Sequence, residues 1–251
     1  MPEPHDPVSL DAPWTRSPPA RHVRSAITTL LLGPLMDLYT QREVHGREHL
    51  AGLDGPVVFV ANHASHMDTP VILRALPGPW RRRTAVAAAA DYFYMDRRLS
   101  LAVALAFGTV PLERKGGGAL SGSMALINGL VADRWSLLVY AEGTRSRDGV
   151  VARLRPGAAV LAQEHGMAIV PVHVSGTHAT MPTGRGWMRR APGRGPGARQ
   201  PIAIRFGAPI SPAPGEHRKE VMERVRVFME ESGARTTAPA RVAAAAAARR
   251  A

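Results

Sequence analysis

Short apolar runs alternate with longer amphipathic stretches through most of the chain. Apolar runs of strand length occur at residues 57–61, 84–90, 135–140, 168–174 and 202–206. Apolar positions repeat at helical spacing in residues 99–107, 120–131, 156–165 and 216–231. Strands that alternate with helices in this way are typical of a largely parallel sheet covered by helices. The pattern therefore predicts an α/β fold, and we find no internal repeat.

The two ends of the chain lack this pattern. Residues 1–22 are rich in proline, and residues 233–251 are mostly alanine and arginine, so we expect both ends to be disordered. The chain of 251 residues is large for one core but short for two. We therefore expect one compact domain at residues 44–232, preceded by a helical segment at residues 23–43.

The helical segment contains an apolar stretch, residues 26–39, that is too short to span a bilayer and is interrupted by a Gly-Pro pair. Arg21, Arg24 and Tyr39 flank this stretch as headgroup-level anchors would, which favours a helix pair lying in the membrane interface. A helix that covers the core is the alternative. The polar, proline-rich beginning of the chain does not resemble a signal peptide. These features predict a protein bound peripherally to the cytoplasmic face of a membrane.

The formal net charge is +12, yet Lys115 and Lys219 are the only lysines. Because abundant arginine reflects coding bias as well as function, the position of the charge is more informative than its total. No acidic residue occurs at residues 165–215, a stretch that contains Trp187, Met188, Arg185, Arg189, Arg190, Arg194, Arg199 and Arg205. We expect this stretch to face anionic lipid headgroups. A basic nucleic-acid-binding protein is the rival class, although the sequence has no helix-turn-helix, zinc-finger or RNA-binding aromatic motif.

A polar run at residues 62–68 (Asn-His-Ala-Ser-His-Met-Asp) directly follows the first apolar run. Turns at the C-terminal edge of a sheet are where open α/β folds place their chemistry. The spacing from His63 to Asp68 lets a chain entering a helix bring the carboxylate to one imidazole nitrogen. The other nitrogen is then free to accept a proton. A buried histidine with satisfied hydrogen bonds is the alternative.

Several kinds of chemistry lack their signatures. The chain has no cysteine, which excludes a thiol enzyme, and no Gly-x-Ser-x-Gly elbow, the signature of an α/β serine hydrolase. A His/Asp pair without a nucleophile suits the activation of a substrate hydroxyl. His63 and His66 have the spacing of two zinc ligands, but no third ligand group accompanies them, so we expect no metal.

A second polar run, residues 140–147 (Tyr-Ala-Glu-Gly-Thr-Arg-Ser-Arg), also follows an apolar run. Gly143 permits close approach of the backbone, Thr144 supplies a hydroxyl, and Arg145 supplies a planar cation suited to phosphate oxygens. These residue types favour a phosphate cradle. The alternative is a charged surface turn in which Glu142 pairs with an arginine of the same run.

Two further segments accompany these runs. Residues 107–118 place Arg114 and Lys115 beside a run of glycines. Residues 168–174 form an apolar run with Pro171 inside it. Because proline cannot donate a ladder hydrogen bond, we expect this strand to lie at an edge of the sheet or to end near the site.

Together these segments resemble the glycerolipid acyltransferase superfamily, whose best-known members are 1-acylglycerol-3-phosphate acyltransferases. The first block of the family, Asn-His-x-Ser-x-x-Asp, is matched in full at residues 62–68, and its Gly-x-x-x-x-x-Arg block is matched at residues 108–114. The third block, usually Phe-Pro-Glu-Gly-Thr-Arg-Ser, appears at residues 140–146 with Tyr-Ala in place of Phe-Pro. The Val-Pro-Val strand appears at residues 170–172. The motifs are specific as a set, and the resemblance spans residues 44–209.

The resemblance implies that residues 44–232 form an acyltransferase domain with a glycerol-3-phosphate acyltransferase-like fold. It implies that His63 is the base and that Asp68 orients it. The same resemblance assigns the acceptor headgroup site to Arg114, Glu142, Gly143, Thr144 and Arg145.

The implied reaction moves a fatty acyl chain from a thioester to the free hydroxyl of a lysophospholipid. The thioester is acyl-CoA or acyl carrier protein, which acts as a co-substrate, and no further cofactor is expected. The first expectation for the acceptor is 1-acylglycerol-3-phosphate, which would give phosphatidic acid. A different lipid alcohol is the alternative acceptor.

Overall fold

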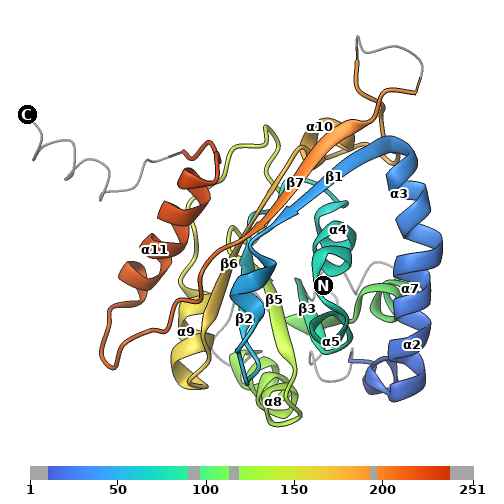
Figure 1. The fold of residues 1–251 in the computed structure, drawn as a ribbon. Helices are drawn as coiled ribbons and strands as arrows, with labels where there is room; N and C mark the ends of the chain where they lie inside the picture. The colour runs from blue at the N-terminus through green and yellow to red at the C-terminus, as the bar shows by residue number, and fades with distance from the viewer. Residues whose placement is uncertain (1–10, 90–96, 113–118, 193–196, 238–251) are drawn as a thin grey trace, which may run out of the picture.

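The computed structural model describes residues 11–89, 97–112, 119–192 and 197–237. A seven-stranded sheet in the order β1-β7-β6-β2-β5-β3-β4 forms its centre (Figure 1). The strands are β1 (Thr40–His45), β2 (Val58–Ala61), β3 (Thr84–Ala89), β4 (Thr109–Leu112), β5 (Ser136–Tyr140), β6 (Ile169–Ser175) and β7 (Gln200–Phe206). Strands β2 to β6 are parallel, β7 is antiparallel to β6, and β1 is parallel to β7. The predicted α/β fold with a mostly parallel sheet is confirmed.

Helices cover both faces of the sheet (Figure 1). One face packs against α4 (Asp68–Ala75), α5 (Gly78–Arg82) and α7 (Arg97–Phe107), and the other packs against α8 (Ala119–Ala132), α9 (Gly157–Glu164) and α11 (Arg218–Glu231). Strand β2 shows how an apolar run serves both faces. Val58 and Val60 lie in the core beneath α8, α9 and α11, whereas Phe59 lies in the core on the α4 side. Successive side chains of a strand point to opposite faces, so a strand buried on both sides is apolar throughout.

Two strands, β1 and β4, were not among the predicted runs. Strand β1 lies at one edge of the sheet and alternates buried or half-buried with exposed side chains, so most of its residues are polar. Residues 40–43 therefore belong to the sheet and not to the predicted interfacial segment. Strand β4 lies at the opposite edge and contains Pro111, which weakens its strand signal.

The predicted disorder of residues 1–22 is wrong for its second half. A 3-10 helix (Pro13–Arg16) is followed by α2 (Pro18–Ala26). The Ser17 side chain accepts a hydrogen bond from the backbone N–H of Ala20 and caps α2. Proline in the first turn of a helix loses no intrahelical hydrogen bond, so the proline-rich sequence starts a helix here.

Helix α2 continues without a break into a π-helical turn (Ile27–Leu32) and α3 (Gly33–Tyr39). These three elements form one rod, residues 18–39, which we call the helical arm (Figure 1). The Gly-Pro pair does not divide the arm into the predicted helix pair. The π-helical turn lies directly before it, where the missing N–H of Pro34 interrupts the regular ladder.

Arg24 fastens the arm to the domain. The prediction that Arg24 is a headgroup anchor is therefore wrong. Its side chain is buried, its Nε donates to the carbonyl of Leu105 at 3.0 Å, and its Nη2 donates to the carbonyl of Thr15 at 2.6 Å. Leu105 lies in the last turn of α7, so the guanidinium pairs with a carbonyl that the helix leaves free. Burial, aided by the neighbouring cations Arg16 and Arg21, lowers the pKa of Arg24 to about 10.

Strand β6 lies inside the sheet, so the edge position is wrong, and the alternative holds: β6 ends near the site, where Val174 hydrogen-bonds the Asn62 side chain. The carbonyl of Pro171 accepts from the N–H of Gly207 at 2.8 Å, so the backbone of Pro171 faces β7. The β6–β7 ladder reaches Val172 opposite Phe206, one residue short of the proline. The N–H that Pro171 lacks would face Gly207, so the proline falls where the regular β6–β7 ladder stops.

At the C-terminal end, order continues past residue 233, where the disordered tail was predicted to begin. Val151 donates to the carbonyl of Arg235 at 2.7 Å and accepts from the N–H of Thr237 at 3.0 Å. Residues 238–251 lie outside the described part of the chain.

Candidate active site

The turns that follow β2 and β5 meet at one edge of the sheet. The two strands are parallel neighbours, with Ala61 opposite Tyr140 at their C-terminal ends. Strand β2 leads to α4 on one face, and β5 leads to α9 on the other. Open α/β sheets bind ligands beyond the strand ends at such a switch point. The structure therefore brings the predicted runs 62–68 and 140–147 together.

His63 and Asp68 form the predicted pair. The Nδ1 atom of His63 lies 2.8 Å from Oδ2 of Asp68, which is fully buried in the first turn of α4. The same Oδ2 accepts the backbone N–H groups of Ala64 at 2.7 Å and Ser65 at 2.8 Å. Because an ionised carboxylate only accepts hydrogen bonds, we assign the imidazole proton to Nδ1. This assignment leaves Nε2 unprotonated and able to accept a proton.

Glu142 has a different role from the one predicted. Its Oε1 accepts the backbone N–H of His63 at 2.8 Å, and its Oε2 accepts the backbone N–H of Ala152 at 2.8 Å. Burial raises the pKa of Glu142, although the two backbone donors oppose this rise. Both oxygens are directed at the protein backbone in the interior, where Glu142 joins the backbone of His63 to that of Ala152.

The second turn binds both polar backbone groups of His63, its N–H and its carbonyl. Besides the contact from Glu142 to its N–H, the carbonyl of His63 accepts from the N–H of Ser146 at 2.7 Å. On the first turn, the Asn62 side chain donates to the carbonyl of Val174 at 2.9 Å and accepts its N–H at 2.8 Å. These contacts fasten the backbone around His63 to the turn after β5 and to β6.

The other predicted headgroup residues lie nearer to solvent. Gly143 has a φ of 72°, and a Cβ there would lie 2.9 Å from Nε of Arg155, so glycine is required. Thr144 is exposed, and Arg145 is half-buried. The guanidinium of Arg145 donates to Nε2 of His66. Burial and the charge of Arg145 lower the pKa of His66, which keeps the ring neutral and able to accept this bond.

No pattern in the sequence indicates a chemical role for Tyr140. In the structure its ring stacks on the His63 imidazole, with centroids 3.9 Å apart and an interplanar angle of 17°. Its hydroxyl shares a hydrogen bond of 2.7 Å with Oγ1 of Thr69. The parallel pairing of residues 57–61 with 135–140 was the signal that would have placed Tyr140 beside His63. No sequence signal pointed to Thr69.

Arg114, the remaining predicted headgroup residue, lies outside the described residues. Among residues 11–89, 97–112, 119–192 and 197–237, no cluster of three or more His, Asp or Glu side chains could hold a metal ion.

Comparisons with known proteins identify the family of the chain. A family model described as Acyltransferase matches residues 41–175, which is more than half of the chain. The chloroplastic 1-acyl-sn-glycerol-3-phosphate acyltransferase BAT2 of Brassica napus is 28% identical over 148 residues, 58% of this chain and 40% of that protein. The chloroplastic 1-acyl-sn-glycerol-3-phosphate acyltransferase LPAT1 of Arabidopsis thaliana is 29% identical over 143 residues, 56% of this chain and 38% of that protein. The chain thus spans about two-fifths of the length of these curated relatives.

The fold is shared with a solved structure. The 1-acyl-sn-glycerophosphate acyltransferase PlsC from Thermotoga maritima superimposes with a TM-score of 0.57 and 23% sequence identity, over 86% of this chain and 80% of that chain. The family match runs from β1 to the end of β6 and includes both turns of the candidate site. The chain belongs to the acyltransferase family.

Proposed function

We propose that the protein transfers a fatty acyl chain from a thioester to the free hydroxyl of 1-acylglycerol-3-phosphate, which gives phosphatidic acid. The observation that carries this proposal is the His63–Asp68 pair, in which Nδ1 is engaged at 2.8 Å and Nε2 is left to accept a proton. The relatives named as 1-acyl-sn-glycerol-3-phosphate acyltransferases support this choice of acceptor. The donor class, acyl-CoA or acyl carrier protein, comes from the family resemblance.

The proposed step needs one base and no covalent intermediate on the protein. The acceptor hydroxyl attacks the thioester carbonyl carbon while Nε2 of His63 takes the hydroxyl proton. A C–O ester bond forms, the C–S bond breaks, and the proton on His63 passes to the leaving thiolate. Asp68 holds the ring and stabilises the positive charge that His63 carries between these transfers.

A thiol-release assay on a panel of thioester donors and lipid acceptors tests this proposal. We expect His63→Ala to lower turnover by about 10²- to 10⁴-fold, because general-base assistance has that magnitude. The matched control is His45→Ala, which changes an exposed histidine on the edge strand β1. Near-wild-type turnover of His63→Ala would contradict the mechanism. Thiol release in the absence of any acceptor would contradict the proposed substrate. So would a failure to release thiol with every phosphorylated acceptor.

We also propose that Arg145 binds the phosphate of the acceptor. It lies on the turn that holds His63, is half-buried, and carries a planar cation suited to phosphate oxygens. Loss of one hydrogen bond to a charged group costs roughly 1.5 to 3 kcal/mol, so Arg145→Ala should raise the KM for the acceptor about 10- to 100-fold with a smaller change in kcat.

The matched control for Arg145 is Arg147→Ala, which removes an exposed cation two residues along the same turn. An unchanged KM in Arg145→Ala, on phosphorylated and unphosphorylated acceptors alike, would favour a plain surface turn.

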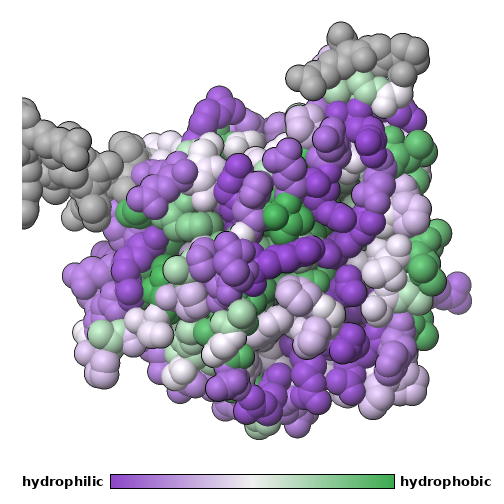
Figure 2. Space-filling view, viewed as in Figure 1, coloured by the Kyte–Doolittle hydropathy of each residue, from purple (hydrophilic) through white to green (hydrophobic). Residues whose placement is uncertain are grey.

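Finally, we propose that the helical arm docks on a membrane surface. Leu30 is 76% exposed and Leu31 is 64% exposed, and apolar side chains lie along the outer edge of the arm (Figure 2). Such side chains gain free energy when they leave water for the apolar part of a lipid interface. None of the helices in the described part of the chain is long and apolar enough to cross a bilayer.

A further inference from the structure

The imidazole of His63 is restrained at one edge by Asp68 and along one face by Tyr140. The contact from Nδ1 to Oδ2 of Asp68, at 2.8 Å, fixes the position of a single ring atom. A ring held only by its Cβ bond and one hydrogen bond can still tilt about the line through those two points. The Tyr140 ring lies 3.9 Å away at 17°, so it blocks that tilt on one side.

The Tyr140 ring is itself held by its hydroxyl. The 2.7 Å hydrogen bond to Thr69 joins the end of β5 to the first turn of α4. Thr69 directly follows Asp68, so both restraints on the imidazole originate from successive residues of one helix turn. The contacts close a ring that runs from His63 to Asp68, along the backbone to Thr69, and back through Tyr140.

We propose that Tyr140 is a positioning residue for His63, and that its hydroxyl acts through Thr69 to hold the imidazole in the orientation that accepts the substrate proton. This inference rests on the proposed acyl transfer for its kinetic meaning. The family block usually has phenylalanine at this position, so the aromatic ring is the shared feature and the hydroxyl contact belongs to this chain.

Two physical effects support the role. An aromatic face attracts a cation, so the stacked phenol stabilises the imidazolium that forms when His63 takes the proton. Burial raises the pKa of Tyr140 well above its usual range, so the hydroxyl stays neutral and keeps its hydrogen bond at any working pH. A Tyr140 that only filled space would need the ring and not the hydroxyl.

The kinetic test compares Tyr140→Phe, Thr69→Val, the double variant and Thr69→Ser. We expect Tyr140→Phe and Thr69→Val each to lower kcat about two- to tenfold with the KM of both substrates unchanged. Because both changes remove the same bond, the double variant should lose no more than either single variant. Thr69→Ser keeps the hydroxyl and should retain wild-type kcat.

A second measurement does not depend on activity. The Nδ1 proton of His63 should give an NMR signal protected from exchange with water, and Tyr140→Phe and Thr69→Val should speed that exchange while Thr69→Ser should not. Unchanged exchange and kcat in Tyr140→Phe, or additive losses in the double variant, would overturn the proposal. If the wild-type protein releases no thiol on any donor, the proposed function fails, and the exchange measurement still decides whether Tyr140 positions His63.

Discussion

The carboxylate of Glu142 is buried, and each of its oxygens accepts a backbone N–H, so its orientation is fixed. Glu142 is 4% exposed and joins the backbone of His63 to that of Ala152. The family block suggested a headgroup ligand because glutamate sits beside Gly-Thr-Arg. The direction of its oxygens depends on how β5 and the following loop fold back, which no pattern in the sequence records.

Glu142→Gln tests this supporting role. The amide keeps one acceptor oxygen but places an NH₂ group against one of the two backbone donors, which leaves a buried N–H unpaired. The free energy of unfolding should fall by about 1–3 kcal/mol, and kcat should fall while the KM for the acceptor stays constant. Urea unfolding and steady-state kinetics measure the two effects.

Glu164→Gln, an exposed position on α9, is the matched control for Glu142→Gln and should change stability by less than about 0.5 kcal/mol. A higher acceptor KM with unchanged stability in Glu142→Gln would restore the headgroup role.

At the scale of elements, the apolar runs predicted the interior strands and missed the edges. Strands β2, β5 and β6 are buried on both faces, so their sequences are largely apolar and easy to recognise. Strand β1 has alternating exposure and a polar sequence, and its identity depends on pairing with β7, which lies far away in the chain. The start of α2 could not be predicted from the sequence, because prolines that start a helix resemble the composition of a disordered end.

The contacts of the candidate site divide in the same way, into those that are local in sequence and those that depend on the pairing of distant segments. His63 and Asp68 are local in sequence, and their hydrogen bond could be predicted from the spacing alone. The contacts of Tyr140 and Thr69 depend on the register between β2 and β5 and on the start of α4, and Glu142 depends on a fold-back to Ala152. The sequence therefore predicted the His63–Asp68 pair, whereas the contacts that surround it required the assembled sheet edge.

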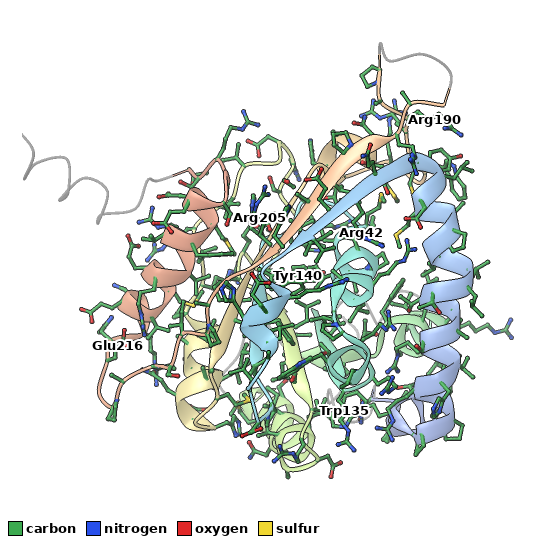
Figure 3. The ribbon with its side chains drawn as sticks, in the orientation of Figure 1. Arg42, Trp135, Tyr140, Arg190, Arg205 and Glu216 are labelled. Carbon is green, nitrogen blue, oxygen red and sulfur yellow. The ribbon has the colours of Figure 1, made fainter. Side chains whose placement is uncertain are left out.

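Strand β6 also carries a titratable group that has no part in the proposed mechanism. His173 is 4% exposed and lies opposite Arg205 of β7, which is visible in Figure 3. Burial, with a smaller effect of the Arg205 charge, lowers the pKa of His173 to about 4. A histidine that is harder to protonate in the folded state than in the unfolded state makes folding weaker as the pH falls.

The sign and size of this effect give a pH prediction. Above pH 6.5 His173 is neutral in both states, and between pH 6.5 and about 4 only the unfolded state binds the proton, so stability is lost over that window. The loss attributable to His173 should reach about 3 kcal/mol near pH 4. Urea unfolding at pH 7 and pH 4 should show a smaller decrease for His173→Gln than for the wild type. Equal decreases would show that His173 is protonated without cost in the folded protein.

At the scale of the whole molecule, the helical arm and the arginine-rich stretch after β6 meet at one end. Trp187 donates its Nε1 hydrogen to the hydroxyl of Tyr39 at 3.2 Å, and the guanidinium of Arg190 lies 5.2 Å from the centre of the Tyr39 ring. Arg190 also donates to the carbonyl of Leu38, and Figure 3 shows it beside the end of α3. Trp187 and Arg190, which belong to the predicted basic face, therefore pack against the C-terminal end of the arm. Arg185 and Arg189 are exposed.

This arrangement decides how membrane docking should be tested. Deleting the arm would remove Arg24 and Met36 from the interior and confuse unfolding with release from the membrane. The double variant Leu30→Ser, Leu31→Ser changes only exposed side chains, so we expect stability within about 0.5 kcal/mol of the wild type. Binding to anionic liposomes should weaken about 10- to 100-fold, because two leucines no longer leave water. Activity on a short-chain soluble acceptor should stay at the wild-type level.

The comparison variant is Arg185→Ser, Arg189→Ser, which removes two exposed cations near the same end of the molecule. Each basic residue near an anionic surface contributes about 1 kcal/mol, and salt screens this part of the attraction. Liposome sedimentation at low and high salt separates the two contributions: the leucine variant should lose the salt-resistant part, and the arginine variant the salt-sensitive part. If the leucine variant sediments like the wild type while the arginine variant is released, the membrane is bound by the stretch after β6, and the arm serves only to cover α7 and the core.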